Sequence, residues 1–491
     1  MSRTHRLQTL ASWLPKLARV GAVVVASGLC ASLGAGGIAT PLSAATIAVD
    51  TLTDTEVDDG QCSLREAIRA ANTDLAYSGC PAGSGSDRVR IDLTGTIVLA
   101  SDLPTITRSL TLSGPATGAL TLNGANHRML FFNGAPNGRT LRVERMTVRN
   151  GLNPIGGGCI TVRTGDHLEV VDSRITACES AEAGGGIYGD SAGSITLQRS
   201  TVDGNLGALG AGGVYLLGEG YPELLTEAAG GAAPTAFMLV EDSTVSGNTG
   251  DGESVGGGIV FGWANGEIRR STVSGNSCGD WGAGIGLIYG TVRIAGSTIT
   301  ANTADTNLDD TEEVGGGLLA HADALYPSAL ELSSSVVAGN LGGTLASDLA
   351  VGPNSAILSL GGNLIGARDG GGAAFPLGGP NSNDDWVGSR AAPIFAALAG
   401  LADNGGPTKT HAPTPGSLLV DHGECPGEPS DQRGYGNLET LQRAVDNPVV
   451  PDSTDGCDIG AFETDGARLP VALFHDGFAG GDTGAWSSAV L

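Results

Sequence analysis

Hydrophobic and polar residues alternate in short runs along most of the chain. Runs such as Leu120–Leu122 and Leu141–Val143 have the period of two that is typical of a β-strand with one buried face. Glycine, asparagine and serine, which favour tight turns, separate these runs. The pattern therefore predicts an all-β chain built from many short strands.

The strands belong to a repeat whose first half reads Ser-x-Val/Ile-x-x-Asn. Full copies lie at Ser200–Asn205, Ser243–Asn248, Ser271–Asn276, Ser297–Asn302 and Ser335–Asn340, and a variant copy lies at Ser173–Cys178. Neighbouring copies start between 26 and 43 residues apart, and a glycine triplet or near-triplet such as Gly256–Gly258 lies between them. A short base spacing with longer insertions indicates one structural turn with loops of variable length.

This repeat predicts a single-stranded, right-handed parallel β-helix, a pectate-lyase-like solenoid. Three short strands would form each coil, and successive coils would stack about 4.8 Å apart. The solenoid is expected over residues 89–365, in roughly ten coils. One asparagine per coil would then form a hydrogen-bonded ladder inside the bend. The expected ladder consists of Asn205, Asn248, Asn276, Asn302 and Asn340.

Residues 1–45 have the pattern of an export signal. Basic residues precede the apolar run Val20–Ile38, and small residues at Ser43–Ala45 suggest cleavage near Ala45. A membrane anchor is the alternative interpretation, but glycines interrupt the run. Beyond residue 45 no apolar stretch of about 18 residues occurs, so no integral membrane span is expected after cleavage. The chain is expected to be secreted or held at the cell surface.

Export places the cysteines in an oxidising compartment, where disulfides form. Their positions favour the pairs Cys62–Cys80, Cys159–Cys178 and Cys425–Cys457, although sequence alone does not fix connectivity. Cys278 is left without a predicted partner. Metal binding or redox chemistry is the alternative, and the spacing matches no zinc pattern.

The amino-acid composition narrows the class of protein further. Of 491 residues 80 are glycine and only 4% are aromatic, which fits a repeat with an aliphatic core. The net charge of −26 disfavours nucleic acid and anionic membranes as partners. We expect a monomer whose partners are cell-surface glycans or surface proteins.

Two segments resemble known families of secreted bacterial proteins. Residues Gln61–Ile68, Ala70–Asn72 and Cys80 resemble the CSLREA domain, here expected over 46–88. The C-terminal motifs at Asp403–Thr408, His411, Pro415–Ser417, Asp431–Gly434 and Asp458–Glu463 are similar to the choice-of-anchor Q domain, here expected over 366–465. The glycine-triplet repeats are also similar to those of polymorphic outer-membrane proteins. These resemblances imply a β-helix at the surface of a Gram-negative bacterium, and they imply no catalytic residues.

The first of these segments also predicts a short capping helix. An amphipathic pattern from Ser63 to Asn72 would place Leu64, Ala67, Ile68 and Ala71 over the open first coil. Arg65 and Glu66 could be a catalytic pair, but a structural ion pair or a cap contact is the favoured interpretation. The tail 466–491 resembles a sorting motif of exported proteins, with a closing strand as the alternative.

Candidate catalytic groups are few. The only lysine after the signal, Lys409, lies outside the expected solenoid, so Arg269 or Arg270 is the best candidate base for a lyase. Because adjacent strand residues point to opposite faces, only one of the two is expected to join a site. The doublets Asp309-Asp310 and Asp384-Asp385 are interpreted as solvated loop charges.

Calcium is the one cofactor that the sequence suggests. The candidate ligands are Asp309, Asp310, Glu312 and Glu313, which could hold an ion between coils. The leading hypothesis is a non-enzymatic, adhesin-like or carbohydrate-contacting scaffold. The alternatives are a polysaccharide lyase or glycoside hydrolase acting on acidic polysaccharide, and a structural matrix protein.

Overall fold

A computed structural model describes residues 44–134, 136–218, 233–251, 255–308, 315–322, 326–368, 372–446, 450 and 456–468. The calcium candidates Asp309, Asp310, Glu312 and Glu313 lie outside these residues, as do nearly all of the export signal and the C-terminal tail. Those expectations therefore stay predictions.

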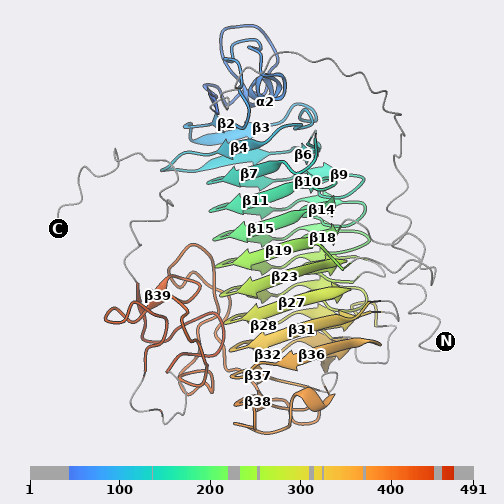
Figure 1. Ribbon diagram of the computed structural model, residues 1–491, viewed down its shortest axis with the longest axis vertical. Helices are drawn as coiled ribbons and strands as arrows, with labels where there is room; N and C mark the ends of the chain where they lie inside the picture. The colour runs from blue at the N-terminus through green and yellow to red at the C-terminus, as the bar shows by residue number, and fades with distance from the viewer. Residues whose placement is uncertain are drawn as a thin grey trace, which may run out of the picture.

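The chain winds into a right-handed parallel β-helix, as the repeat predicts (Figure 1). Four sheets run along its length, which we number 1 to 4. Sheet 1 contains β1 (Thr46–Ala48), β2 (Asp87–Arg90), β4 (Leu110–Ser113), β7 (Thr140–Glu144), β11 (His167–Val171), β15 (Ser194–Gln198), β19 (Ala236–Glu241), β23 (Ala264–Arg269), β27 (Gly290–Ala295), β31 (Ser328–Ser333) and β36 (Ser355–Ser359). Sheet 2 contains β6 (Leu130–Phe132), β10 (Ile160–Val162), β14 (Ile187–Ala192), β18 (Val214–Gly218), β22 (Ile259–Gly262), β26 (Ile285–Ile288), β30 (Leu318–His321) and β35 (Leu349–Val351).

The other two sheets complete each coil. Sheet 3 contains β3 (Gly95–Val98), β5 (Leu120–Asn123), β8 (Thr147–Arg149), β12 (Arg174–Thr176), β16 (Thr201–Asp203), β20 (Thr244–Ser246), β24 (Thr272–Ser274), β28 (Thr298–Thr300), β32 (Val336–Ala338), β37 (Leu364–Ile365) and β38 (Trp386–Val387). Sheet 4 contains the two-residue strands β9 (Leu152–Asn153), β13 (Glu179–Ser180), β17 (Leu206–Gly207), β21 (Thr249–Gly250), β25 (Ser277–Cys278), β29 (Thr303–Ala304), β33 (Leu341–Gly342) and β34 (Leu345–Ala346). Only β34 in this sheet pairs in the antiparallel sense.

Two features of the solenoid differ from the sequence-based expectation. A fourth, two-residue strand follows each ladder asparagine in the central coils, where three strands per coil were expected. Parallel pairing also begins at β1 and continues to β38, so the coils extend beyond residues 89–365 at both ends. The terminal coils lack the asparagine motif, and the repeat therefore gave no signal there.

The interior of the solenoid is a set of aliphatic columns. On sheet 3 one position per coil faces inward and is fully buried: Ile175, Val202, Val245, Val273, Ile299, Val337 and Ile365. Burying such a side chain stabilises the fold by about 1.5–3 kcal/mol. Because each coil adds one β-branched residue to the same column, stability is distributed along the length of the solenoid.

The five predicted asparagines form the ladder. Each Nδ2 atom in the first four donates to the Oδ1 of the next asparagine, at 2.8–2.9 Å. The backbone N–H of the same residue donates to the same oxygen, at 3.0–3.1 Å. These side chains are at most 1% exposed, so the ladder satisfies polar groups that water does not reach.

The serines that open the repeat form a second column. In Ser200, Ser243 and Ser271, for example, the hydroxyl accepts from the backbone N–H of the serine one coil earlier, at 3.1–3.2 Å. Each of the three hydroxyls donates to a carbonyl two residues earlier in its own coil. The sequence showed the recurrence of this serine, and its role becomes clear only once the coils are stacked.

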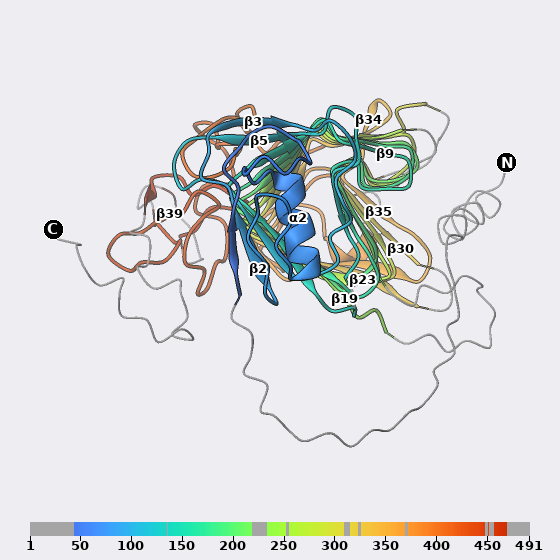
Figure 2. The ribbon, with the colours of Figure 1, turned by 90° about the horizontal axis from the view of Figure 1, so that it is seen from above.

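Helix α2 (Leu64–Thr73) closes the first coil, as predicted (Figure 2). The Ser63 side chain accepts from the Glu66 backbone, and the Glu66 carboxylate accepts from the Ser63 N–H, which completes a capping box. Arg65 is 6% exposed and pairs with Asp54 at 2.7 Å. Both residues are therefore structural, which agrees with the favoured interpretation.

The three predicted disulfides are present: Cys62–Cys80, Cys159–Cys178 and Cys425–Cys457. Cys178 occupies the ladder position one coil before Asn205, and its backbone N–H donates to the Oδ1 of that asparagine at 3.0 Å. The Cys159–Cys178 bridge thus lies where the ladder begins. Cys278 is a buried free thiol, and burial raises its pKa.

The C-terminal region packs along the side of the solenoid as irregular loops (Figure 1). Besides β38, its regular elements within the described residues are η1 (Gly372–Ala374) and the antiparallel pair β39 (Tyr435–Gly436) and β40 (Ala467–Arg468). Leu419 and Ile459 pack against Val336 and Leu364 of sheet 3. This region therefore covers part of that sheet and leaves sheets 1 and 2 on other sides of the coil.

Candidate functional site

The candidate bases Arg269 and Arg270 lie where the chain turns from sheet 1 to sheet 3. At this corner five successive coils place a residue with positive φ, between 45° and 56°, directly before the repeat serine or its equivalent. These residues are Arg145, Asp172, Arg199, Asp242 and Arg270. Non-glycine residues seldom adopt this conformation. Their charges alternate from coil to coil, and we call this set the corner column.

Ion pairs join neighbouring members of the corner column. Arg199 contacts both carboxylate oxygens of Asp172, at 2.7 and 2.9 Å. Arg270 donates to Asp242 at 2.8 Å and also to Glu241 at 2.5 Å. A planar guanidinium can hold two carboxylate oxygens at once, so each pair links two successive coils.

Burial and charge act in opposite directions on these carboxyl groups. Burial raises the pKa of Asp242 to about 6, although the charge of Arg270 opposes the shift. Burial would also raise the pKa of Glu241, but the hydrogen bond from Arg269 and the charge of Arg270 hold it below its usual value. Burial would lower the pKa of Arg270, but the charges of Asp242, Glu428 and Glu241 and the hydrogen bond to Asp242 together raise it. Arg270 therefore cannot release its proton as a general base.

The expectation that only one of the two arginines could join a site is wrong. Arg269 Nε and Arg270 Nη2 both donate to the same oxygen of Glu241, at 2.8 and 2.5 Å. The alternation rule fails here because Arg270 lies in the turn, beyond the end of β23. Lys409 is exposed, and its backbone carbonyl accepts from the Thr244 hydroxyl at 2.6 Å.

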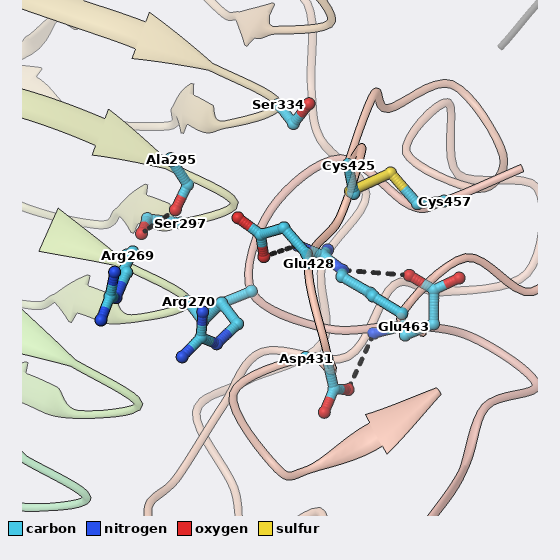
Figure 3. A network of polar contacts seen from close by, with 12 residues as sticks. Arg269, Arg270, Ala295, Ser297, Ser334, Cys425, Glu428, Asp431, Cys457 and Glu463 are labelled. Carbon is cyan, nitrogen blue, oxygen red and sulfur yellow. Dashed lines mark hydrogen bonds and ion pairs between the residues drawn. A yellow bond between two sulfur atoms is a disulfide. The ribbon is translucent and has the colours of Figure 1, made fainter. Parts of the chain in front are cut away.

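At the next corner position the C-terminal region supplies the charged side chains (Figure 3). The next corner position is Gly296, where a Cβ atom would lie 2.5 Å from Nη1 of Arg443. Arg443 is fully buried, and it pairs with Glu463 at 3.1 Å and with Glu428 at 3.7 Å. The glycine thus leaves room for a cation from another part of the chain.

Further polar contacts attach this region to sheet 3. Gln432 accepts from the Thr272 hydroxyl at 2.7 Å and donates to the Ser243 carbonyl at 3.1 Å. His411 Nε2 lies 2.8 Å from the Ser274 hydroxyl, and its Nδ1 lies 2.7 Å from the Ala399 carbonyl.

The Ser274–His411 contact has the hydrogen bonding of a nucleophile and its base. Burial lowers the pKa of His411, so the ring is neutral and its Nε2 accepts from the serine hydroxyl. Both residues are nevertheless buried, at 4% and 7% exposure, where the C-terminal region meets the solenoid. A substrate cannot reach the hydroxyl there, and we interpret the pair as a docking contact.

The interpretation of Asp385 as a solvated charge is wrong. Asp385 is fully buried and accepts from the N–H and Nδ2 of Asn363, each at 2.9 Å. Asp348 ends the asparagine ladder in the same way, accepting from the N–H and Nδ2 of Asn340 at 2.9 and 2.7 Å. Sequence could not indicate this, because neither aspartate lies at a recurring position of the repeat.

Asp348 makes the stability of the fold depend on pH. Burial raises its pKa from the usual 3.8 of an aspartate to about 7, so the folded chain binds a proton more tightly than the unfolded chain. Its contribution to stability is therefore fully present below about pH 4 and is lost as the pH rises through about 7. We expect Asp348→Asn to remove this part of the pH dependence. The free energy of unfolding in urea, measured between pH 4 and pH 8, tests this expectation. If it depends on pH in the same way in the parent chain and in Asp348→Asn, the assignment is contradicted.

Other site chemistry is not evident in the described residues. Within them no group of three or more histidine, cysteine, aspartate or glutamate side chains could hold a metal ion. No helix in the described ranges has the length and apolar character to cross a bilayer.

Comparison with known proteins identifies neither a family nor an activity for the chain. No family model matches the chain, so the resemblances to the CSLREA, choice-of-anchor Q and polymorphic outer-membrane families stay predictions. No curated protein matches it either. Among solved structures, the crystal structure of pectate lyase Pel9A is similar, with 10% identity over 85% of this chain and 96% of that chain. The TM-score is 0.37, and at this value the likeness carries no argument about activity.

Proposed function

We propose that the protein is an exported bacterial β-helix scaffold, secreted or held at the cell surface, that contacts glycans or surface proteins without cleaving them. The observation that carries this proposal is that the candidate bases are already held in ion pairs. Arg269 and Arg270 are bound to Glu241, and Arg270 is bound to Asp242 as well. A lyase needs a base that can take a proton, and an arginine in such a network retains its own.

The architecture supports a binding role in a second way. Stability comes from the stacked aliphatic columns and the asparagine ladder, which need no ligand. The C-terminal region occupies part of sheet 3, so the other faces remain for partners. Disulfides at both ends and in the middle of the described chain fit an oxidising extracellular setting.

A glycan array with residues 46–491 tests the proposal, run once with calcium and once with a chelator. We expect specific retention of a glycan class and no release of reducing ends or unsaturated sugars. Cleavage of a uronate polymer would overturn the proposal in favour of a lyase or hydrolase. Absence of binding to every glycan and to bacterial or host cells would also overturn it, in favour of a structural matrix role.

A further inference from the structure

Sheet 3 carries a row of threonines on its outer face, one residue per coil, which only Arg174 interrupts. The next residue in each strand, such as Ile97, Leu122 or Val148, is buried in the core, so the row itself faces outward. We call this set the threonine row. It consists of Thr96, Thr121, Thr147, Arg174, Thr201, Thr244, Thr272 and Thr298.

The C-terminal region covers one end of the threonine row and bonds to it through amide groups. The Thr272 hydroxyl donates to Oε1 of Gln432 at 2.7 Å, and Nε2 of the same side chain donates to the Thr244 hydroxyl at 2.9 Å. The Thr298 hydroxyl accepts from the backbone N–H of Ala461 at 3.0 Å. All three threonines are at most 2% exposed. A single carboxamide therefore bridges two threonines of successive coils, with its C=O and its N–H both in use.

The other end of the threonine row has the same arrangement without this cover. Thr96 is exposed, and Thr121 and Thr147 are half-buried. The strands place these residues one coil apart, in the same register as Thr244 and Thr272. Within the described chain, no hydrogen bond engages any of these three hydroxyls. Because Thr121 has a threonine on both sides, two pairs of the kind that Gln432 bridges are open to a ligand.

A donor lies beside the free threonines. Asn123 and Arg149 are the next outward residues of β5 and β8. The Oδ1 atom of Asn123 already accepts from Asn150 at 3.1 Å, whereas Arg149 is exposed and forms no ion pair with a described residue. A guanidinium donates to the oxygens of hydroxyl groups. This part of the face therefore suits a ligand that combines amide groups with neighbouring hydroxyls.

We propose that Thr96, Thr121 and Thr147 bind the acetamido groups of an N-acetylated glycan. An acetamido group has a C=O that accepts and an N–H that donates, like the carboxamide of Gln432, and a hydroxyl can match either role. In a trans amide these two groups point in opposite directions, so each can face one of two neighbouring threonines. Repeated sugars that engage both pairs would add their binding energies. This inference rests on the proposed glycan-binding function and names its ligand class.

Calorimetric titration of the purified chain with a tetramer of N-acetylglucosamine tests the site. We expect Thr121→Val, which removes the central hydroxyl but keeps the shape of the side chain, to weaken binding about tenfold. Thr121→Ser keeps the hydroxyl and should bind like the parent chain. Thr196→Val is the matched control, since it makes the same change at a half-buried outward position of sheet 1, and it should leave the affinity unchanged. A glucose tetramer of the same linkage, which has hydroxyls in place of the acetamido groups, should bind at least about tenfold more weakly.

Each contrary result has a distinct meaning. Equal affinities of the parent chain and Thr121→Val, at unchanged melting temperature, would overturn the site. Equal or tighter binding of a blocked glutamine tripeptide would overturn the glycan assignment in favour of a protein partner. If the glycan array shows specific binding but the N-acetylglucosamine tetramer does not bind, this inference fails while the proposed function stands. If no glycan binds at all, the proposed function fails with it.

Discussion

Asn276→Ala is expected to lower the free energy of unfolding by about 3–5 kcal/mol, because it breaks the ladder at its centre. The substitution leaves the N–H and Nδ2 of Asn248 without the oxygen that they now share, at 3.0 and 2.9 Å. It also removes the donor to Asn302 and the contact with the Val245 carbonyl. Since these groups are buried, water cannot replace the lost partners.

Urea unfolding followed by tryptophan fluorescence measures this loss. Asn133→Ala is the matched control, because it removes the same atoms from an exposed side chain, and we expect a change within about 0.5 kcal/mol. If the two variants unfold at the same urea concentration, the ladder does not stabilise the fold. A shift confined to the coils around Asn276 would mean that the solenoid unfolds in sections.

Arg443→Met is expected to cost about 3–5 kcal/mol of the stability with which the C-terminal region is held on the solenoid. The change leaves the Glu463 carboxylate buried without its cation. Burial already raises the pKa of Glu463 to about 8, against the charge of Arg443. The carbonyl of Asp458, now 2.9 Å from the guanidinium, also loses its donor.

Limited proteolysis of the C-terminal region, with thermal unfolding alongside, measures the effect. Arg174→Met is the control, since Arg174 forms an exposed pair with Asp203 and should cost at most about 1 kcal/mol. Adding Glu463→Gln to Arg443→Met should recover part of the loss by replacing the buried carboxyl group that has lost its partner. Identical cleavage in Arg443→Met and in the parent chain would show that the buried network does not hold the region in place.

The sequence predicted the features that repeat. The Ser-x-Val/Ile-x-x-Asn motif specified the coil and the ladder, because one position per coil meets the same position in the next. The capping helix and the three disulfides were also predicted, since each depends on residues close in the chain. Contacts such as Gln432 with Thr272 join segments far apart in the sequence and leave no periodic trace.

The candidate site was predicted less well, and for a related reason. Arg270 was assigned by strand alternation, but a turn with positive φ brings it to the same carboxylate as Arg269. Asp385 was interpreted as a solvated charge, but it accepts hydrogen bonds from Asn363, and the two residues form no motif along the chain.

The carboxylate of Asp348 gives the asparagine ladder its last acceptor. In every ladder asparagine, Nδ2 donates to the ladder residue that follows it in the chain. An asparagine in place of Asp348 would therefore present N–H donors of its own. An ionised aspartate only accepts, and it leaves no donor to recruit another molecule. The asparagine ladder is therefore a chain of hydrogen bonds that ends at Asp348. The ladder therefore closes inside the protein, and the coils that follow, as far as β38, stack without it.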